Sequence, residues 1–332
     1  MQFGQLKRRD FITLLGGAVA SWPLAARAQQ AAMPVVIGFL SSGSPDAYTQ
    51  LLPAFREGLA ETGYVEGRNA AIEFRWAEGT FDRLPALASD LVQRRVAVIV
   101  TTGTTSALAA KAATTTIPLV FLGADDPVKH GLVASLNRPG GNATGLNVLT
   151  SELTGKRLEL IRELVPTAAV VAVLINPKSP EAEPQLRDMQ TAARTIGQQI
   201  YILNASSEHD VVTAFATLVQ RRDGALLVTN DAFFTDQTEQ LVALAARYTV
   251  PTIYDRRRYT VAGGLISYGT HYVGAYRQLG IYTAKILNGA KPADLPIEQA
   301  TKFELVINLK TAKALGITIP QTLQVAADEV IE

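Results

Sequence analysis

The chain has 332 residues, of which 48% are hydrophobic and 18% are charged, and its formal net charge is +1 at pH 7. This composition is typical of a globular protein of about two domains, and it excludes a largely disordered chain. The near-neutral net charge does not indicate binding to nucleic acid or to a charged membrane surface. Because the chain has no cysteine, disulfides, thiolate metal sites and cysteine nucleophiles are excluded as well.

Residues 1–28 have the pattern of a cleaved export signal. The pair Arg8 and Arg9 precedes an apolar stretch at 13–26, an order typical of a twin-arginine signal, and small residues lead up to Ala28. The apolar stretch is shorter than the roughly 20 residues that a membrane span needs. We therefore expect cleavage after Ala28 and a soluble periplasmic protein without a lipid anchor. The motif alone leaves export through the general pathway open.

Beyond residue 33, apolar runs that predict buried strands alternate with amphipathic runs that predict helices. The first series has strands at 35–40, 71–76, 96–100 and 119–122, and helices at 47–61, 84–94 and 106–113. After 139–145, which breaks regular structure, a helix at 153–164 leads to strands at 170–175, 199–203, 225–228 and 252–254 and helices at 185–196, 211–220 and 237–248. A strand at 263–269, a helix at 273–287 and a strand at 302–308 follow. This alternation predicts parallel sheets covered by helices on both faces.

The two series repeat each other. The sequence Leu-Val-Gln-Arg-Arg stands before a strand at 91–95 and again at 218–222, and a β-branched residue followed by proline recurs at 117–118 and 250–251. Two copies of one α/β lobe explain this repeat. In open parallel sheets ligands bind beyond the carboxyl ends of the strands. We therefore predict an α/β fold of two Rossmann-like lobes with the ligand cleft between them.

Four stretches of the sequence carry a family resemblance, namely residues 54–64, 137–145, 263–269 and 303–313. With them the chain resembles bacterial ABC-transporter substrate-binding proteins, specifically the family that includes tryptophan- and tyrosine-binding members, which have the type I periplasmic binding protein fold. The resemblance covers essentially all of the chain after the signal. It implies a solute that is delivered unchanged to a permease in the inner membrane.

The resemblance also implies how the chain is divided between the lobes. Crossings are expected near 143–147, 267–270 and 291–300. The first lobe then comprises residues 33–145 and 269–293, and the second comprises 146–268 and 300–332. We expect this two-lobed protein to be a monomer.

Polar turns at the predicted strand ends supply the candidate ligand-binding residues. At the turn around Gly103 the glycine lets the backbone approach a ligand, Thr104 or Thr105 can cap the helix, and free amides can hold a bound group. The same residues also make an ordinary βα turn. The full set of candidates is Ser41, Ser42, Gly43, Thr102, Gly103, Thr104, Asp125, Asp126, Asn176, Asp231, Tyr254 and Tyr268. We expect an amino acid or related carboxylate whose carboxylate binds the first lobe.

The acidic candidates have competing roles. Asp231 follows the strand at 225–228, where it either takes the ammonium of the solute or caps the next helix. Asp125 and Asp126 end a strand, and capping of the next turn is favoured over contact with the ligand. Asp255 is a further candidate for the ammonium.

Aromatic residues cluster where the cleft is expected, namely Phe233, Phe234, Tyr254, Tyr268 and Tyr272. Tyr254 and Tyr268 are expected at the cleft, because tyrosine offers both a stacking face and a polar tip. Phe233, Phe234 and Trp76 are expected in the core. The arginines that follow Tyr254 are expected in a solvated loop, with one guanidinium reaching an acidic ligand as the alternative; they are Arg256, Arg257 and Arg258.

Catalytic and phosphate-binding motifs are missing from the sequence. There is no G-x-S-x-G, G-x-G-x-x-G after a strand, Walker A or H-E-x-x-H pattern. His130, His209 and His271 are far apart and are expected at the surface or as hydrogen-bonding groups of the pocket. We therefore expect no enzyme, no cofactor and no metal site. The alternatives are an exported α/β enzyme that uses carboxylates of the cleft and a ligand-sensing subunit of a signalling receptor.

Overall fold

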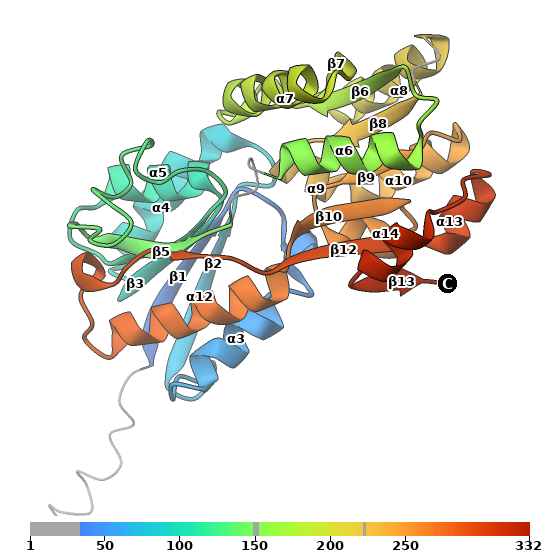
Figure 1. Cartoon of the computed structure of the whole chain (residues 1–332). Coiled ribbons are helices and arrows are strands. Elements are labelled where there is room, and N and C mark those ends of the chain that lie inside the picture. The colour runs from blue at the N-terminus through green and yellow to red at the C-terminus, as the bar shows by residue number, and fades with distance from the viewer. Residues whose placement is uncertain (1–33, 149–152, 222–223) are drawn as a thin grey trace, which may run out of the picture.

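A computed structural model describes residues 34–148, 153–221 and 224–332, and it places them in two α/β lobes (Figure 1). The expected export signal at residues 1–28 lies outside the described residues. In the described part of the chain, no helix combines the length and the apolar character needed to cross a membrane.

A six-stranded parallel sheet forms the centre of the first lobe, in the order β11-β5-β4-β3-β1-β2. Its strands are β1 (Val35–Ser41), β2 (Ala70–Trp76), β3 (Val98–Thr102), β4 (Leu119–Gly123), β5 (Ala143–Asn147) and β11 (Glu298–Gln299). The helices between them are α3 (Leu52–Ala60), α4 (Leu84–Gln93) and α5 (Thr104–Ala113), with short 3-10 helices η1 (Pro45–Tyr48) and η2 (Phe81–Arg83). This alternation is the predicted one, because β-branched apolar runs form the buried strands.

The long helix α12 (Tyr272–Leu287) returns to the first lobe and packs against α3 (Figure 1). Two glycines make this contact close: a Cβ at Gly58 would overlap the backbone of α12 at Arg277, and a Cβ at Gly280 would overlap that of α3 at Phe55. Leu279 at the same interface is fully buried. A late segment of the chain therefore completes the core of the first lobe.

The second lobe has a seven-stranded sheet, in the order β13-β12-β10-β9-β8-β6-β7. Its strands are β6 (Val170–Ile175), β7 (Gln199–Asn204), β8 (Ala225–Val228), β9 (Thr252–Tyr254), β10 (Ile266–Thr270), β12 (Phe303–Asn308) and β13 (Glu329–Ile331). Its helices are α6 (Thr154–Leu164), α7 (Ala182–Ile196), α8 (Glu208–Arg221), α9 (Ala232–Asp236), α10 (Thr238–Arg247), α11 (Arg257–Val261), α13 (Leu309–Ala314) and α14 (Gln321–Ala326).

One pair in this sheet is antiparallel, in contrast to the predicted parallel sheets. Strand β12 runs antiparallel to β10. Strand β10 ends beside the first lobe, whereas β12 begins there, because the chain returns to the second sheet from β11. Because the last crossing enters the second sheet from the first lobe, β12 runs in the direction opposite to that of β10.

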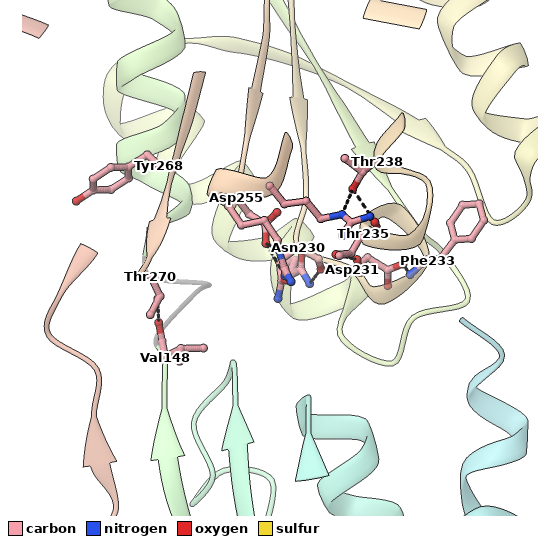
Figure 2. Close-up of polar contacts among 12 residues, drawn as sticks. Val148, Asn230, Asp231, Phe233, Thr235, Thr238, Asp255, Tyr268 and Thr270 are labelled. Atoms are coloured by element: carbon pink, nitrogen blue, oxygen red, sulfur yellow. Dashed lines mark hydrogen bonds and ion pairs between the residues drawn. The ribbon is translucent and has the colours of Figure 1, made fainter. Parts of the chain in front are cut away.

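The crossings lie later in the chain than predicted. The segment 143–147 is strand β5, which pairs with β4 of the first sheet, and β11 extends the same sheet to Gln299. Gly269 and Thr270 pair with β12 in the second sheet. The hydroxyl of Thr270 donates a hydrogen bond of 2.8 Å to the carbonyl of Val148, which joins two of the crossings (Figure 2).

Strand β5 was predicted as a break because glycine and proline surround it. In the structure, Gly145 lies in the strand with φ +154°, and a Cβ there would overlap the backbone of Phe121 on β4. The glycine therefore permits a close approach between neighbouring strands instead of ending them.

Candidate functional site

A cavity lies between the lobes, beyond the carboxyl ends of strands in both sheets. Its empty volume is about 650 Å³, part of which opens to solvent. The first lobe contributes Ser42, Gly43, Tyr48, Thr102, Gly103, Thr105, Tyr272 and Tyr276 to the lining, and the second contributes Ser179, Glu181, Asn230, Asp231, Asp236 and Arg256.

The turn between β3 and α5 forms part of the first-lobe wall. Gly103, with φ +96°, occupies the N-cap position of α5, and no side chain caps this helix. The predicted capping by Thr104 or Thr105 is wrong, and Thr104 Oγ1 instead accepts a hydrogen bond of 3.2 Å from the backbone N of Ala124 at the end of β4. The first amides of α5 consequently remain without a side-chain cap at the cavity.

The turn after β1 forms the neighbouring part of this wall. Ser42 and Gly43 line the cavity, as predicted. Ser41 is fully buried behind them, and its Oγ accepts a hydrogen bond of 3.2 Å from the N of Gly43. Ser41 therefore shapes the turn without lining the cavity.

Three tyrosines complete the first-lobe wall, of which Tyr272 was expected near the cleft and Tyr48 and Tyr276 were not selected from the sequence. Tyr48 lies on η1, and its ring is 5.1 Å from that of Trp76 and 6.0 Å from that of Tyr276. Thr102 Oγ1 donates to the Tyr48 hydroxyl at 3.3 Å. Tyr272 and Tyr276 are four residues apart on α12, so that they share one face of the helix. In the sequence, two tyrosines four residues apart at the start of a helix that follows a crossing were the signal that could have indicated this part of the wall.

Asp231 occupies the corresponding position in the second lobe, after β8. Its Oδ1 accepts hydrogen bonds from the N of Phe233 at 2.9 Å and from Nδ2 of Asn176 at 3.0 Å, so it caps α9 (Figure 2). Its Oδ2 has no hydrogen-bond partner among the described residues, although the side chain lines the cavity and is 6% exposed. Burial raises the pKa of Asp231 to about 6, while the nearby donors of Asn176, Ser179 and the amides of Phe233 and Phe234 act in the opposite direction. The predicted helix cap is confirmed, and contact with the ammonium of a solute stays a prediction, for which Oδ2 lies at the cavity.

Two further carboxylates connect the second lobe to the first. Asp236, at the end of α9, accepts hydrogen bonds from the N of Ser44 at 3.1 Å and from its hydroxyl at 2.7 Å. Glu181, just before α7, faces the hydroxyl and backbone N–H of Thr104 across the cavity. Burial, together with the charges of Asp125 and Asp231, raises the pKa of Glu181 to about 8.

Arg256 lines the cavity, and so the expected solvated loop is wrong for this residue. Its Nε and Nη2 donate to Oδ2 of Asp255 at 2.9 Å and 2.8 Å, and Nη2 donates to Oδ1 of Asn230 at 2.5 Å. Its guanidinium lies 4.7 Å from the ring centroid of Tyr272, where it makes a cation–π contact between the lobes.

The other two arginines of this run also have partners. Arg257 forms a two-pronged ion pair with Glu329 at 2.6 Å and 2.7 Å. Arg258 donates from Nη1 to the carbonyl of Asp46 in the first lobe at 3.0 Å. Neither lines the cavity between the lobes.

The two tyrosines expected at the cleft lie elsewhere. Tyr254 is fully buried in the core of the second lobe, with its ring stacked 4.5 Å from that of Tyr259. Tyr268 packs near Phe303, with 6.4 Å between the rings, and Figure 2 shows it directed away from Asp231. Both residues lie within strands, whose side chains point toward the helices that cover the sheet and not beyond the strand end. The expected core location holds for Phe234, which is fully buried.

The remaining candidates support the turns near the cavity. Asp126 caps its own turn, because its Oδ1 accepts hydrogen bonds from the N of Val128 at 2.9 Å and of Lys129 at 3.3 Å. Asp125 is buried, with Oδ2 3.8 Å from Nε2 of His130. Asn176 is buried behind Asp231 and orients its carboxylate. Within the described ranges, no group of three or more metal-ligating side chains could hold a metal ion.

Two facing α/β lobes with a polar and aromatic cavity between them define a solute-binding protein. The chain belongs to the ABC transporter substrate binding protein family, whose model matches residues 36–331. A tyrosine-binding protein of Clostridioides difficile (strain R20291) is 29% identical over 263 residues, which cover 79% of this chain and 75% of that protein. This protein is therefore a substrate-binding protein and not an enzyme.

Two solved structures show the same architecture. A conserved domain protein from Vibrio cholerae is 28% identical, with a TM-score of 0.82 over 89% of this chain and 99% of that one. An ABC domain from Streptococcus pneumoniae in complex with L-Trp is 25% identical, with a TM-score of 0.81 over 90% of this chain and 100% of that one. These similarities agree with the predicted type I periplasmic binding protein fold.

Proposed function

We propose that this protein is the periplasmic receptor of an ABC importer that binds an amino acid with an aromatic side chain and delivers it to a permease in the inner membrane. The observation that carries this proposal is the Oδ2 atom of Asp231, a buried carboxylate oxygen without a hydrogen-bond partner among the described residues. A buried carboxylate is costly unless it is paired, and an ammonium group satisfies it.

The first lobe supplies the complementary groups. The carboxylate of the amino acid binds at the N-terminus of α5, where backbone amides and the hydroxyls of Ser42 and Thr105 face the cavity. Its side chain packs against Tyr48, Tyr272 and Tyr276. The relatives that bind tyrosine and L-Trp support the same class of ligand.

A ligand series tests this assignment directly. Calorimetric titration compares L-tyrosine with 3-(4-hydroxyphenyl)propionate, which lacks the ammonium, and with tyramine, which lacks the carboxylate. We expect L-tyrosine or L-tryptophan to bind most tightly and to raise the melting temperature. Equal affinity for L-tyrosine and the propionate would contradict the role of Asp231.

Export is tested separately. Replacement of Arg8 and Arg9 by lysine is expected to leave precursor in the cytoplasm, because the twin-arginine route requires both residues. Arg27→Lys in the same signal is the matched control, and mass spectrometry of the mature protein shows whether cleavage follows Ala28. Unaltered export of the double variant would exclude the twin-arginine route and indicate export through the general pathway.

A further inference from the structure

The proposed function does not use Glu181, although this carboxyl group lies on the cavity. Glu181 immediately precedes α7 of the second lobe and lines the cavity together with Asp231. Across the cavity it faces Thr104, the first residue of α5 in the first lobe. It therefore reaches the helix N-terminus to which the ligand carboxylate is assigned.

The groups that face Glu181 make its ionisation unfavourable. Asp125, on the loop after β4, and Asp231, after β8, both act on it with like charge. His130 lies beside Asp125, 3.8 Å from its carboxylate. Arg256 lies on the same wall of the cavity, but its guanidinium is paired with Asp255.

The other charged groups near the start of α7 lie outside the cavity. Glu183 is exposed, and its carboxylate lies 3.6 Å from Nη1 of Arg187 on the same helix. Helix α7 therefore supplies no positive charge to compensate the carboxylates at the cavity.

The position of Glu181 depends on the arrangement of the lobes. With the lobes together, Glu181 is half-buried on the wall of the cavity beside Asp231, and the charges of Asp231 and Asp125 oppose its ionisation. Separation of the lobes would part Glu181 from Thr104 and Asp125 and expose it to water. In that case the closed arrangement binds one more proton than the open one.

We propose that closure of the cleft over an amino acid is coupled to the uptake of one proton by Glu181, which completes the binding site as a neutral carboxyl group. In that form it can donate a hydrogen bond to the ligand carboxylate at the N-terminus of α5. As an anion it would repel that carboxylate and compete for the same amides. The part that concerns the ligand rests on the proposed function, whereas the coupling to closure rests on the two lobes alone.

The sign of the pH dependence follows from the direction of the pKa shift. Burial and like charges raise the pKa of Glu181 to about 8 in the closed arrangement, whereas an exposed glutamate has a value of about 4.3. The closed form is therefore favoured as the pH falls from 8 toward 5. We expect affinity for L-tryptophan to rise roughly tenfold or more between pH 8 and pH 6, and protonation of Asp231, whose pKa is about 6, offsets about twofold of this rise at the lower end of the window.

Calorimetric titration with L-tryptophan and L-tyrosine at pH 7, in buffers of different ionisation enthalpy, counts the protons taken up. The wild-type protein should take up close to one proton per ligand. Glu181→Gln mimics the neutral carboxyl group and should bind without this uptake and with no rise in affinity between pH 8 and pH 6. Glu183→Gln, the matched control two residues along the chain, should behave like the wild type.

Small-angle scattering of the ligand-free protein tests the coupling without any ligand. The wild type and Glu183→Gln should become more compact between pH 9 and pH 6, and Glu181→Gln should not change. Failure of both amino acids to bind would overturn the proposed ligand class, and the scattering result would then decide the proposal for Glu181. Scattering that does not change with pH in the wild type, or proton uptake that persists in Glu181→Gln, would overturn the coupling.

Discussion

The two walls of the cavity are made from the same structural unit but differ in chemistry. Each is built from turns that follow the carboxyl ends of parallel strands. The lining from the first lobe contains hydroxyls, glycines, backbone amides and tyrosines, with no aspartate, glutamate, lysine or arginine among the described lining residues. The charged lining residues, namely Glu181, Asp231, Asp236 and Arg256, come from the second lobe.

This difference shows that a repeated fold does not repeat its function. The topology of each lobe brings strand ends to the cavity, whereas the residues at those ends decide which part of a solute each wall contacts. The first wall suits an aromatic ring and a carboxylate held by amides. The second wall provides negative charge for an ammonium. Variants that change one wall at a time should therefore have different effects.

The largest effect is expected on stability, from loss of the buried ion pair in the second wall. Arg256→Ala leaves Asp255, which is 1% exposed, without its guanidinium partner. Removal of one partner of a buried pair costs about 3–5 kcal/mol. Urea unfolding measures the change in the free energy of unfolding.

The neighbouring arginine offers the control for this variant. Arg257→Ala removes an ion pair with Glu329 in which both side chains are 38% exposed, and exposed pairs contribute about 0–1 kcal/mol. Equal losses from the two variants would show that burial does not distinguish the two pairs.

The next effect is expected on affinity. Asp231→Asn keeps the shape of the side chain, and its oxygen can still cap α9, but the negative charge is lost. If this charge holds the ammonium of the ligand, the loss is about 1.5–3 kcal/mol, or roughly ten- to hundredfold in affinity. Calorimetry with L-tyrosine measures it. The matched control is Asp126→Asn, a carboxylate that caps a turn outside the cavity, and unchanged binding in Asp231→Asn would restrict Asp231 to capping.

A variant of the first wall should change the preference among amino acids more than the recognition of their charged groups. Tyr48→Leu keeps an apolar side chain and removes the ring, which is worth about 0.5–1.5 kcal/mol in an aromatic contact. We expect the affinity ratio of L-tyrosine to L-leucine to fall, with little change for L-leucine. Tyr201→Leu, on β7, leaves the cavity lining intact and serves as the control. An equal fall for both ligands would mean that Tyr48 acts on closure alone.

The smallest effect is expected where the two walls touch. Ser44→Ala removes the 2.7 Å hydrogen bond from its hydroxyl to Asp236 and keeps the one from the backbone. A hydrogen bond to a charged group contributes about 1.5–3 kcal/mol. This one is only partly buried and the backbone bond to the same carboxylate remains, so we expect a smaller loss, about two- to threefold in affinity. Because this contact closes the cleft without touching the solute, all ligands should lose affinity equally. A change in the ranking of ligands would contradict this role.

The sequence predicted the fold well where apolar periodicity was strong. Strands β1, β6, β8 and β9 were expected within a residue of their observed bounds, because runs of β-branched residues mark buried strands. Strand β5 was missed because Gly145, which as a sequence signal indicates a break, instead permits a close contact with Phe121 on the neighbouring strand β4. Strands β11 and β13 are too short to show a period.

The site was predicted only in part. The turns at Ser42, Gly103 and Asp231 were found because topology places strand ends at the cleft. Tyr254 was assigned wrongly because the pleat of a strand decides which way a side chain points. Glu181 and Arg256 were missed or assigned to solvent, since charged residues in loops are normally exposed and here the facing lobe encloses them.

The contact between α3 and α12 also determines when the first lobe can fold during synthesis. Gly58 and Gly280 meet at this contact although more than 200 residues separate them in the chain. At translation rates of about 5–20 residues per second, α3 waits roughly 10–40 s for its partner. During that time the apolar face of α3, including Phe55 and Leu59, has no cover from α12. The first half of the chain to be made is thus an aggregation-prone intermediate until α12 has been synthesised, and it is the stage at which a chaperone would bind.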